Sequence, residues 1–547
     1  MRLIPTGRAG ELLPALACLA VLGLFLAAPL AGLASQAFAP EGRFTLKVFA
    51  DYFSTPGLTR SLLNTILLGL GVVALVTPVA FVTAFALERS RIPFKGLLQA
   101  IASGPLLIPS LLPALALVYL FGRQGLLTPM FGGRTIYGGQ GVLLADAIAA
   151  FPHALIVLRT TLAAADGRLY EQAKLLGAGA WRTFWRITLP GARHGLVSAG
   201  VVVFSLTIAD VGAPKVVGGD FDVLALDIYK AVLGRQDFPT GAAAALFLLL
   251  PSVAAVVIER MAARRQAALV SSRSTLYSPP PDLGRDLWLG GFCALVAAAI
   301  LSVFLVCQWA ALVRQWPYDL SLSLASYHLD NDTGGGWSAV LNSVALGLVV
   351  ALIGAAVAFA GAYAAERTTA PRPLRVILST FALAPAATPG LALGLAYVLF
   401  FNDPANPLHL IYATFAILVA VTVVHFYTVG HLTLVSALKA LDPEFEAAGR
   451  ALGRGRFALI GRVIAPMCAP ALVEVAVYLF VGATTTVSAV VFLYPPDVQL
   501  ASVAVLNLDD AGDIAPAAAM GMLIVYVNLI ARGLGLAARG ALARGRR

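Results

Sequence analysis

Long apolar stretches separated by short polar segments recur along the whole 547-residue chain. Each stretch holds roughly 20 residues or more, the length that an α-helix needs to cross ~30 Å of hydrocarbon. We find twelve stretches, near residues 12–38, 62–87, 97–121, 140–162, 193–213, 240–258, 287–312, 338–364, 374–401, 408–436, 470–493 and 515–537. The pattern predicts an all-α, polytopic membrane protein with about twelve transmembrane helices.

The composition agrees with this prediction. Only 12% of the residues are charged and the mean hydropathy is +0.86, so the chain lacks the polar surface that a water-soluble protein of this length needs. The first stretch follows Arg2 and Arg8 but is too long for the apolar core of a signal peptide. We therefore expect a retained first helix.

The four cysteines lie in or beside apolar stretches and show no metal-ligand spacing. They are Cys18, Cys293, Cys307 and Cys468. Packing is the simplest role for them, because neither a disulfide framework nor a metal site fits their positions.

The net charge is +10, and the basic residues lie mainly on one side of the membrane in the predicted topology. With a cytoplasmic N-terminus, 29 of the 38 Lys and Arg residues fall on the inside, whereas 14 of the 28 Asp and Glu residues fall outside. The nine outside bases are Arg43, Lys47, Arg60, Arg123, Arg134, Lys215, Lys230, Arg235 and Arg314. This bias places both termini in the cytoplasm, and it predicts no nucleic-acid partner.

The second half of the chain repeats the first. The segment that starts at Asn64 matches the segment that starts at Asn342, so that Glu88-Arg89 falls on Glu366-Arg367 and Tyr119 falls on Tyr397, a shift of 278 residues. We expect two six-helix domains of parallel topology, at 1–259 and 287–547, joined by a polar cytoplasmic linker at 260–286.

A basic segment between the fourth and fifth stretches reads EQAKLLGAGAWRTFWRITLP, residues 171–190. Good helix formers flank GlyAlaGly at 177–179, which predicts a helix, a tight turn, a second helix and then a break at Pro190. One interpretation is an amphipathic interfacial helix, with Arg182 and Arg186 near lipid phosphates.

The same segment recurs in the second half. Asp166, Gly177 and Pro190 correspond to Asp442, Gly453 and Pro466 at a shift of 276 residues, with 13 residues from the glycine to the proline in both copies. This recurrence favours a docking element over an interfacial helix.

The segment resembles the EAA motif of binding-protein-dependent ABC importer permeases. The matching residues are Glu171, Ala173, Gly177, Ile187, Leu189 and Pro190. The resemblance implies a type I importer-like fold, in which this loop forms a coupling helix that seats in a groove of an ATPase subunit. It also implies two ATPase subunits that hold the ATP, a periplasmic binding protein, a bacterial inner membrane and no cofactor on this chain.

The second copy departs from the motif. Glu446 stands seven residues before Gly453, where Glu171 stands six before Gly177, so Ala447 occupies the acidic position. Ala465 replaces the leucine before Pro466. We expect docking in this half too, without giving Glu446 the contact of Glu171.

The outside loop at 210–239, together with the fused layout, is similar to permeases for 2-aminoethylphosphonate uptake. Relatives of those permeases include fused iron(III) and thiamine permeases. The resemblance therefore implies a small periplasmic solute, with a phosphonate as the first expectation and iron(III) or thiamine as alternatives. The binding protein is expected to dock on the outside loops, including 214–239 and 494–514.

Two other classes of protein are considered from the residues alone. A secondary carrier also uses twelve spans in two parallel halves, but it needs no paired docking loops. A lipid-modifying enzyme needs clustered acids and histidines at one membrane face. No GlyXXXXGlyLys followed by Ser or Thr, no HisGluXXHis and no GlyXSerXGly occurs in the sequence, so we expect neither ATP hydrolysis nor other catalysis on this chain.

Few ionisable residues fall within the apolar stretches, where each is costly. Asp146 and His153 are seven residues apart and share a helix face, and Asp210 lies near the outer end of the fifth stretch. The others are Glu474, His425 and His431. A satisfied packing role is the simpler interpretation for each, but Asp146, His153 and Asp210 are our candidates for the translocation pathway. Thr422 and Thr486 stand in the places of the two aspartates in the second half.

Overall fold

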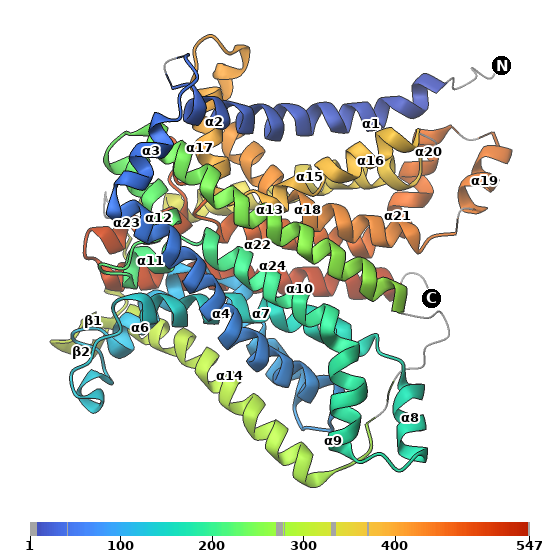
Figure 1. The fold of residues 1–547 in the computed structure, drawn as a ribbon, viewed down its shortest axis with the longest axis horizontal. Helices are drawn as coiled ribbons and strands as arrows, with labels where there is room; N and C mark the ends of the chain where they lie inside the picture. Colours follow the sequence, from blue (N-terminus) through green and yellow to red (C-terminus); the bar gives the residue numbers. More distant parts are fainter. Residues whose placement is uncertain are drawn as a thin grey trace. The chain divides into compact units, whose positions relative to one another are not determined.

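The computed structural model describes residues 8–40, 42–269, 277, 279–329, 335–368, 371–442, 444–453 and 455–544 (Figure 1). The expected cytoplasmic linker at 260–286 lies partly outside the described residues, because residues 270–276 and Ser278 are not among them.

Helices make up nearly all of the described chain, and η denotes a 3₁₀ or π turn. The first part contains α1 (Arg8–Leu22), η1 (Gly23–Ala27), α2 (Ala28–Phe38), α3 (Lys47–Ser54), α4 (Pro56–Arg89), α5 (Lys95–Ala102), η2 (Gly104–Leu107), α6 (Leu111–Phe121), η3 (Thr128–Phe131), α7 (Gly139–Ala163), α8 (Gly167–Leu175), α9 (Ala180–Thr183), η4 (Phe184–Thr188), α10 (Leu189–Ala209), α11 (Gly212–Val217), α12 (Leu224–Tyr229), η5 (Lys230–Gly234) and α13 (Phe238–Leu269).

The second part contains α14 (Leu283–Leu312), β1 (Val313–Gln315), β2 (Asp319–Leu322), η6 (Ala325–Tyr327), α15 (Gly336–Glu366), α16 (Arg372–Phe381), η7 (Ala384–Ala387), α17 (Gly390–Phe401), η8 (Pro407–Ile411), α18 (Phe415–Lys439), α19 (Glu444–Ala451), α20 (Arg456–Leu459), η9 (Ile460–Ile464), α21 (Ala465–Met467), α22 (Ala469–Thr485), α23 (Ala501–Asp510) and α24 (Ile514–Arg544). The antiparallel hairpin β1–β2, which pairs Val313 with Leu322, is the one sheet in the described part of the chain.

The predicted fold class is confirmed, with a correction to the spans. Nine helices in the described residues are long and apolar enough to cross a membrane, and two further pairs make eleven if each bent pair is one span. The apolar stretches at 97–121 and 374–401 do not form single straight helices. The first is divided into α5, η2 and the short helix α6, and the second bends by 107° between η7 and α17.

Prolines explain both breaks. Pro105 and Pro109 interrupt the first segment, and Pro385 and Pro389 interrupt the second. A proline removes a helical N–H group, and it also drives the preceding residue toward extended backbone. Accordingly Ile108, which precedes Pro109, has φ −119° and ψ 148°. These stretches are apolar enough for a span, but their prolines lie at positions that interrupt a continuous helix.

The chain divides into two compact units that do not follow the expected halves. One unit contains residues 1–45, 329–504 and 523–547, and the other contains 46–328 and 505–522. The division at 1–259 and 287–547 therefore describes the sequence repeat, and as a division into domains it stays a prediction.

In each unit, the first long helix of one half of the sequence packs against the third apolar segment of the other half, which contains α6 or α17. In the first unit, the Tyr397 hydroxyl on α17 donates to the carbonyl of Phe25 in η1 at 2.6 Å. In the second unit, Tyr119 on α6, which corresponds to Tyr397, lies in a buried cluster with Ala310 and Ala311 of α14. The repeat noticed at these tyrosines thus marks two equivalent packing sites.

The start of the second helix of each half carries a second duplicated contact. On α4, Asn64 donates to the carbonyl of Asp222 at 2.9 Å, and on α15, Asn342 donates to the carbonyl of Gln499 at 3.1 Å. The next residue, Thr65 or Ser343, accepts the N–H of the first residue of α12 or α23 at 2.8 Å. These bonds satisfy helix-terminal N–H groups that are buried.

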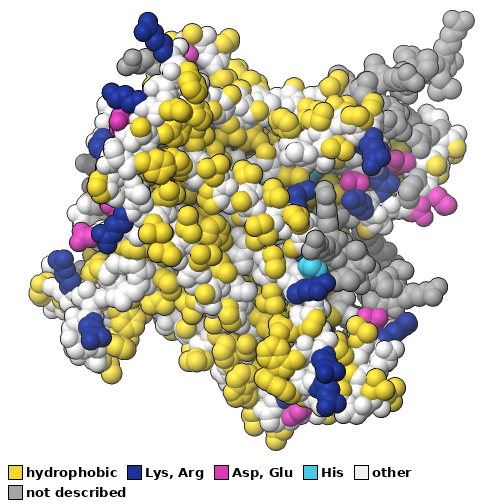
Figure 2. Space-filling model, viewed as in Figure 1, with side chains coloured by type: hydrophobic (Ala, Val, Ile, Leu, Met, Phe, Trp, Pro, Cys, Tyr) yellow, Lys and Arg dark blue, Asp and Glu magenta, His cyan; other side chains and the backbone are white. Residues whose placement is uncertain are grey.

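Apolar side chains cover much of the surface that Figure 2 shows, and Lys and Arg lie mainly toward two of its edges. On α4 the exposed leucines Leu63, Leu67 and Leu70 follow helical spacing and form one face. A face of this kind would be costly in water, so it is typical of a helix covered by lipid.

Candidate functional site

The first candidate loop has the predicted helix, turn and helix. Helix α8 begins after Asp166, whose side chain accepts the N–H of Arg168 at 3.1 Å. It ends where Gly177 adopts φ +68°, and the Ala178 N–H returns to the carbonyl of Ala173 at 2.9 Å. Glycine is favoured there because a Cβ atom strains a left-handed backbone. Helix α9 follows at Ala180.

The predicted break at Pro190 is wrong. Helix α9, the π turn η4 and α10 form one continuous helix, Ala180–Ala209, in which Pro190 occupies the first turn of α10. A proline ring ordinarily clashes with the carbonyl four residues earlier. The wider π turn directly before α10 offers a physical reason why the helix continues, because it shifts that carbonyl out of register.

The second candidate loop has the same order of elements. Helix α19 is followed by Gly453 with φ +69°, then by α20 and by the π turn η9, at the position that corresponds to η4. Here the helix does bend, by 77°, between Met467 and Ala469, directly after Pro466. The two copies therefore share their turn and differ in how they enter the next span.

Large apolar side chains project from both loops at corresponding positions. Leu176 and Leu452 precede the turn glycines and are 84% and 78% exposed. Trp181 and Phe457, five residues on, are 74% and 85% exposed. Because exposed apolar groups in polar loops mark contact surfaces, we expect a partner or a lipid surface to cover them.

An arginine that marks the repeat in the sequence contacts each loop, and it is buried in the first copy and partly buried in the second. Arg89, at the end of α4, is 4% exposed and donates to the carbonyl of Leu162 at 2.6 Å. Its guanidinium carbon lies 4.7 Å from the ring centre of Tyr170 on α8. In the second half, Arg367 donates to the carbonyl of Leu441 at 2.6 Å and also to that of Leu438, which corresponds to Leu162.

The residue that meets the arginine differs between the copies. Tyr170 corresponds to Glu446, whose carboxylate lies 3.9 Å from Arg367. Glu446 is buried, whereas Glu171 is exposed and corresponds to the exposed Ala447. Glu446 thus takes the place of a tyrosine that packs inward. Because the acid is displaced by one residue, the arginine of the second copy meets a carboxylate where that of the first copy meets a tyrosine ring. The recurrence of the GluArg pair in the sequence is the signal that identifies these two arginines as equivalent.

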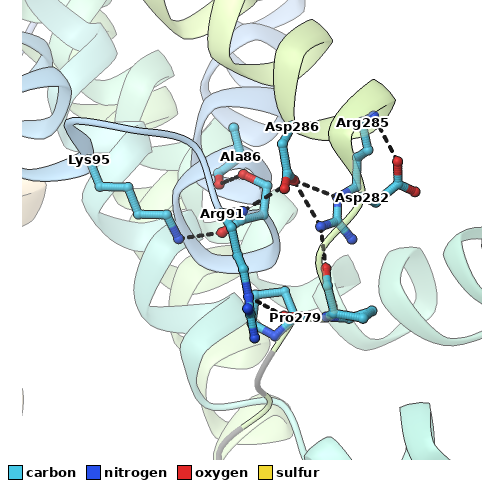
Figure 3. A network of polar contacts seen from close by, with 9 residues as sticks. Ala86, Arg91, Lys95, Pro279, Asp282, Arg285 and Asp286 are labelled. Carbon is cyan, nitrogen blue, oxygen red and sulfur yellow. Dashed lines mark hydrogen bonds and ion pairs between the residues drawn. The ribbon is translucent and has the colours of Figure 1, made fainter.

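The end of the linker is fastened next to the first loop by a network of polar contacts (Figure 3). The backbone N–H of Arg91 donates to the Asp286 carboxylate at 3.2 Å, and its Nε donates to the carbonyl of Pro279 at 2.9 Å. Arg285 donates to the carbonyl of Pro280 at 2.7 Å and to Asp286 at 2.8 Å. The segment after residue 278 is therefore held at the end of α4.

Two of the pathway candidates come together. The Asp210 carboxyl group lies within hydrogen-bonding reach of Asp146 on α7 and of the Ser110 hydroxyl group, and it accepts the N–H of Ala213 at 2.8 Å. Asp146 is buried, and its Oδ2 atom has no hydrogen-bond partner in the described residues. Ser110 follows the proline break of the third segment, so that break helps to form the site.

The other ionisable candidates do not join this pair. The Nδ1 atom of His153 is buried without a hydrogen-bond partner among the described residues. His431 contacts the hydroxyl group of Tyr427 at 3.1 Å. Glu474 is exposed and lies 3.4 Å from Arg539. In the described parts of the chain, no group of three or more His, Cys, Asp or Glu residues has the arrangement of a metal site.

A basic pocket of about 750 Å³ lies at the opposite end of α4 and α7 from the first loop. Its lining includes Arg60, Arg123 and Lys215, three of the nine bases expected outside. Lys215 pairs with Asp510 at 3.1 Å, while within the described chain no ion pair occupies Arg60 or Arg123. The pocket also contains Gly138, the N-cap of α7, which has no side chain to cap the helix. Asp220 also lines the pocket, and the Arg123 guanidinium carbon lies 6.0 Å from the ring centre of Tyr137. The two guanidinium groups that have no ion pair in the described chain and the helix N-terminus are suited to an oxyanion.

The outside loop at 210–239 contains a second buried acid, Asp227 on α12. It interacts with Ser61 of α4 and with the hydroxyl group of Tyr52 on α3. Burial, together with the nearby charge of Asp222, raises the pKa of Asp227 to about 6 against the opposing effects of the Ser61 hydrogen bond and of nearby bases. This carboxyl group lies where α3, α4 and the loop meet.

Comparison with known proteins matches most of the chain to one family. Residues 76–267 and 357–537 match the model of the binding-protein-dependent transport system inner membrane component. Both loops and both arginines, Arg89 and Arg367, fall within the two matched segments. The duplication seen in the sequence is thus a duplication of this family's domain.

Two similar curated proteins are ferric permeases. The ferric transport system permease protein FbpB of Actinobacillus pleuropneumoniae is 26% identical over 90% of this chain and 72% of its own length. A second FbpB protein, from Haemophilus influenzae, is 25% identical over 81% of this chain and 71% of its length. The sulfate permease CysW of Synechococcus elongatus is 31% identical over 36% of this chain and 69% of its length.

The raised pKa of Asp227 predicts a pH-dependent stability. The folded chain binds this proton more tightly than the unfolded chain, whose ordinary pKa is 3.8. The stabilisation is present below that value and is lost as the pH rises through about 6. Asp227→Asn should therefore be more stable than the wild type at pH 8, by about 3 kcal/mol, and nearly match it near pH 4.

Thermal unfolding in detergent across this pH range measures the difference. Asp51→Asn is the matched control, because Asp51 lies on the neighbouring helix α3 and is exposed. Its effect should stay within about 1 kcal/mol at every pH. A constant difference between Asp227→Asn and the wild type from pH 4 to pH 8 would contradict the assignment.

Proposed function

The chain belongs to the family of binding-protein-dependent transport system inner membrane components, and on this premise we propose that it is the permease subunit of an importer for ferric iron. As a family member it is a multi-pass membrane permease component and not itself an ATPase. The observation that carries the proposal is the pair of turn loops, each with a left-handed glycine and exposed apolar side chains.

We assign these loops to two ABC ATPase subunits, on a chain with both termini in the bacterial cytoplasm. The contact residues are Glu171, Ala173, Gly177, Leu189 and Pro190 in the first half and Glu446, Ala447, Gly453 and Pro466 in the second. Of these, Glu171, Ala447, both glycines and both prolines are exposed and can meet a partner directly. Ala173 and Glu446 are buried, so their part is to shape the loop.

The loops join the helices that line the candidate pathway. The arginine at the end of α4 binds the end of α7 and the first loop, so a movement of the loop acts on both helices. Asp146 and Asp210 lie on α7 and at the end of α10. ATP-driven closure of the ATPases then favours one of two access states, because nucleotide and solute each bind one state more tightly.

Ferric iron is favoured as the solute by the two FbpB relatives, which cover most of this chain. The paired carboxyl groups of Asp146 and Asp210 suit a cation or an amino group. A 2-aminoethylphosphonate is the second candidate, and the basic pocket with Arg60 and Arg123 favours it, because guanidinium groups bind oxyanions bidentately. A periplasmic binding protein delivers either solute to the outside loops. No observation favours thiamine.

Substitution of the turn glycines tests the coupling role. A β-branched residue at φ +68° or +69° strains the backbone by about 1–3 kcal/mol. An added Cβ meets no atom within 4 Å at either glycine, so the fold itself has room for it. We expect Gly177→Val/Gly453→Val to reduce uptake at least about tenfold and to weaken ATPase co-purification.

Gly179 and Gly455 provide the matched control. Both lie two residues after a turn glycine, with open space around an added Cβ and no left-handed φ. Gly179→Val/Gly455→Val should retain most of the uptake. Normal uptake by the Gly177→Val/Gly453→Val variant would rule out the coupling assignment.

Uptake measured with each candidate solute separates the two assignments. If the cargo is ferric iron, loss of the gene should impair growth under iron limitation and leave growth on 2-aminoethylphosphonate unchanged. The opposite result would replace iron by the phosphonate. In that case Arg123→Gln should reduce phosphonate uptake roughly fivefold to tenfold, since a charge-assisted hydrogen bond contributes about 1.5–3 kcal/mol before solvent screening. Normal growth in both media would refute both solutes.

A further inference from the structure

The linker does more than join the halves: we propose that it braces the first coupling loop, with Tyr277 as a positioning residue for ATPase docking. This inference rests on the proposed docking role of the loop. Its evidence lies in three side chains that come from three segments of the chain, Arg89 at the end of α4, Tyr170 on α8 and Tyr277 in the linker.

The three side chains form a closed cluster. The guanidinium carbon of Arg89 lies 4.7 Å from the ring centre of Tyr170 and 4.6 Å from that of Tyr277. The ring centres of the two tyrosines are 4.5 Å apart, with an angle of 45° between the ring planes. Each member therefore contacts the other two, and removal of Tyr277 opens one side of the arginine to water.

Arg89 needs these rings because it is a buried cation with few polar partners. Its Nη2 atom donates to the carbonyl of Leu162, while its Nε atom is buried without a hydrogen-bond partner in the described chain. A buried charge is costly unless it is compensated. The two aromatic rings supply that compensation, since a guanidinium group near a ring is attracted by the ring's quadrupole.

The cluster reaches the far side of the loop. The hydroxyl group of Tyr170 lies 3.2 Å from the hydroxyl group of Thr188 in η4. The first short helix is thereby joined to the helix that enters the membrane, and the position of Arg89 fixes both. Tyr277 thus acts on the loop through Arg89 and Tyr170 and not through a contact with the ATPase.

The linker is held in the position that this role needs. Two residues beyond Tyr277, the carbonyl of Pro279 accepts the Nε–H of Arg91, and Asp286 accepts the backbone N–H of the same arginine (Figure 3). These bonds prevent the linker from leaving the end of α4, so that Tyr277 stays next to Arg89.

In the second loop, the charge of the corresponding arginine is compensated without a residue of the linker. Arg367 donates to two backbone carbonyls and faces the Glu446 carboxylate at 3.9 Å. No aromatic ring within the described chain is recorded against its guanidinium group. The brace is therefore a property of the first loop, and the two docking contacts respond differently to changes in the linker.

The test compares Tyr277→Ala with Tyr277→Phe in the full-length permease. The measured quantities are the ATPase concentration that gives half-maximal complex formation, solute uptake and the melting temperature. Because one cation–π contact corresponds to about a fivefold change in an equilibrium, Tyr277→Ala should raise that concentration about fivefold. Tyr277→Phe keeps the ring and should behave as the wild type. Arg89→Lys keeps the charge but loses the planar group, so it should resemble Tyr277→Ala.

Tyr318→Ala is the matched control, since Tyr318 is 77% exposed in the turn of the β1–β2 hairpin and contacts neither loop. It should leave ATPase binding unchanged. Equal ATPase binding by Tyr277→Ala and wild type, while Gly177→Val impairs it, would overturn the brace alone. Equal binding by all three would overturn the docking role on which the brace rests. If Tyr277→Ala and Tyr277→Phe both melt at a lower temperature than the wild type, the aromatic ring is not what matters, and the brace would also be overturned.

Discussion

The contacts of one arginine at the end of the second long helix of each half, buried in the first copy and partly buried in the second, hold the candidate site together. Arg89 and Arg367 each donate to carbonyls at the end of the next long helix, α7 or α18, and each meets a residue of the adjoining loop. A guanidinium group in this position cannot lose its partners without a large cost. The arginine therefore ties helix ends and loop into one mechanical element.

Duplication has preserved this element and varied its chemistry. One copy uses two tyrosine rings, and the other uses the carboxylate of Glu446. The turns stay alike because a left-handed residue is required in both, and glycine meets that requirement at the lowest cost. The helix entries differ, since one continues past Pro190 and the other bends after Pro466. Two loops of one origin can thus transmit unequal movements to their halves.

Much of this could be predicted from the sequence, because apolar length and period determine membrane helices and the repeat identifies equivalent positions. The turn glycines were found in this way. The broken third segment was missed because hydropathy averages over Pro105 and Pro109. The exchange of first helices, the pairing of Asp146 with Asp210 and the contact of Tyr277 with Arg89 join residues far apart in sequence. Such contacts depend on packing, which no local pattern encodes.

We propose that both loops dock on ATPase subunits, and site-directed cross-linking reports this contact without relying on uptake. Leu176 and Leu452 are the exposed side chains next to the two turns, and the four native cysteines are buried. Leu176→Cys and Leu452→Cys should each cross-link to an ATPase in the assembled complex, whereas Leu126→Cys, exposed at the opposite end of the helices, should not. Failure of both loop positions to cross-link, or equal cross-linking at Leu126, would contradict the account.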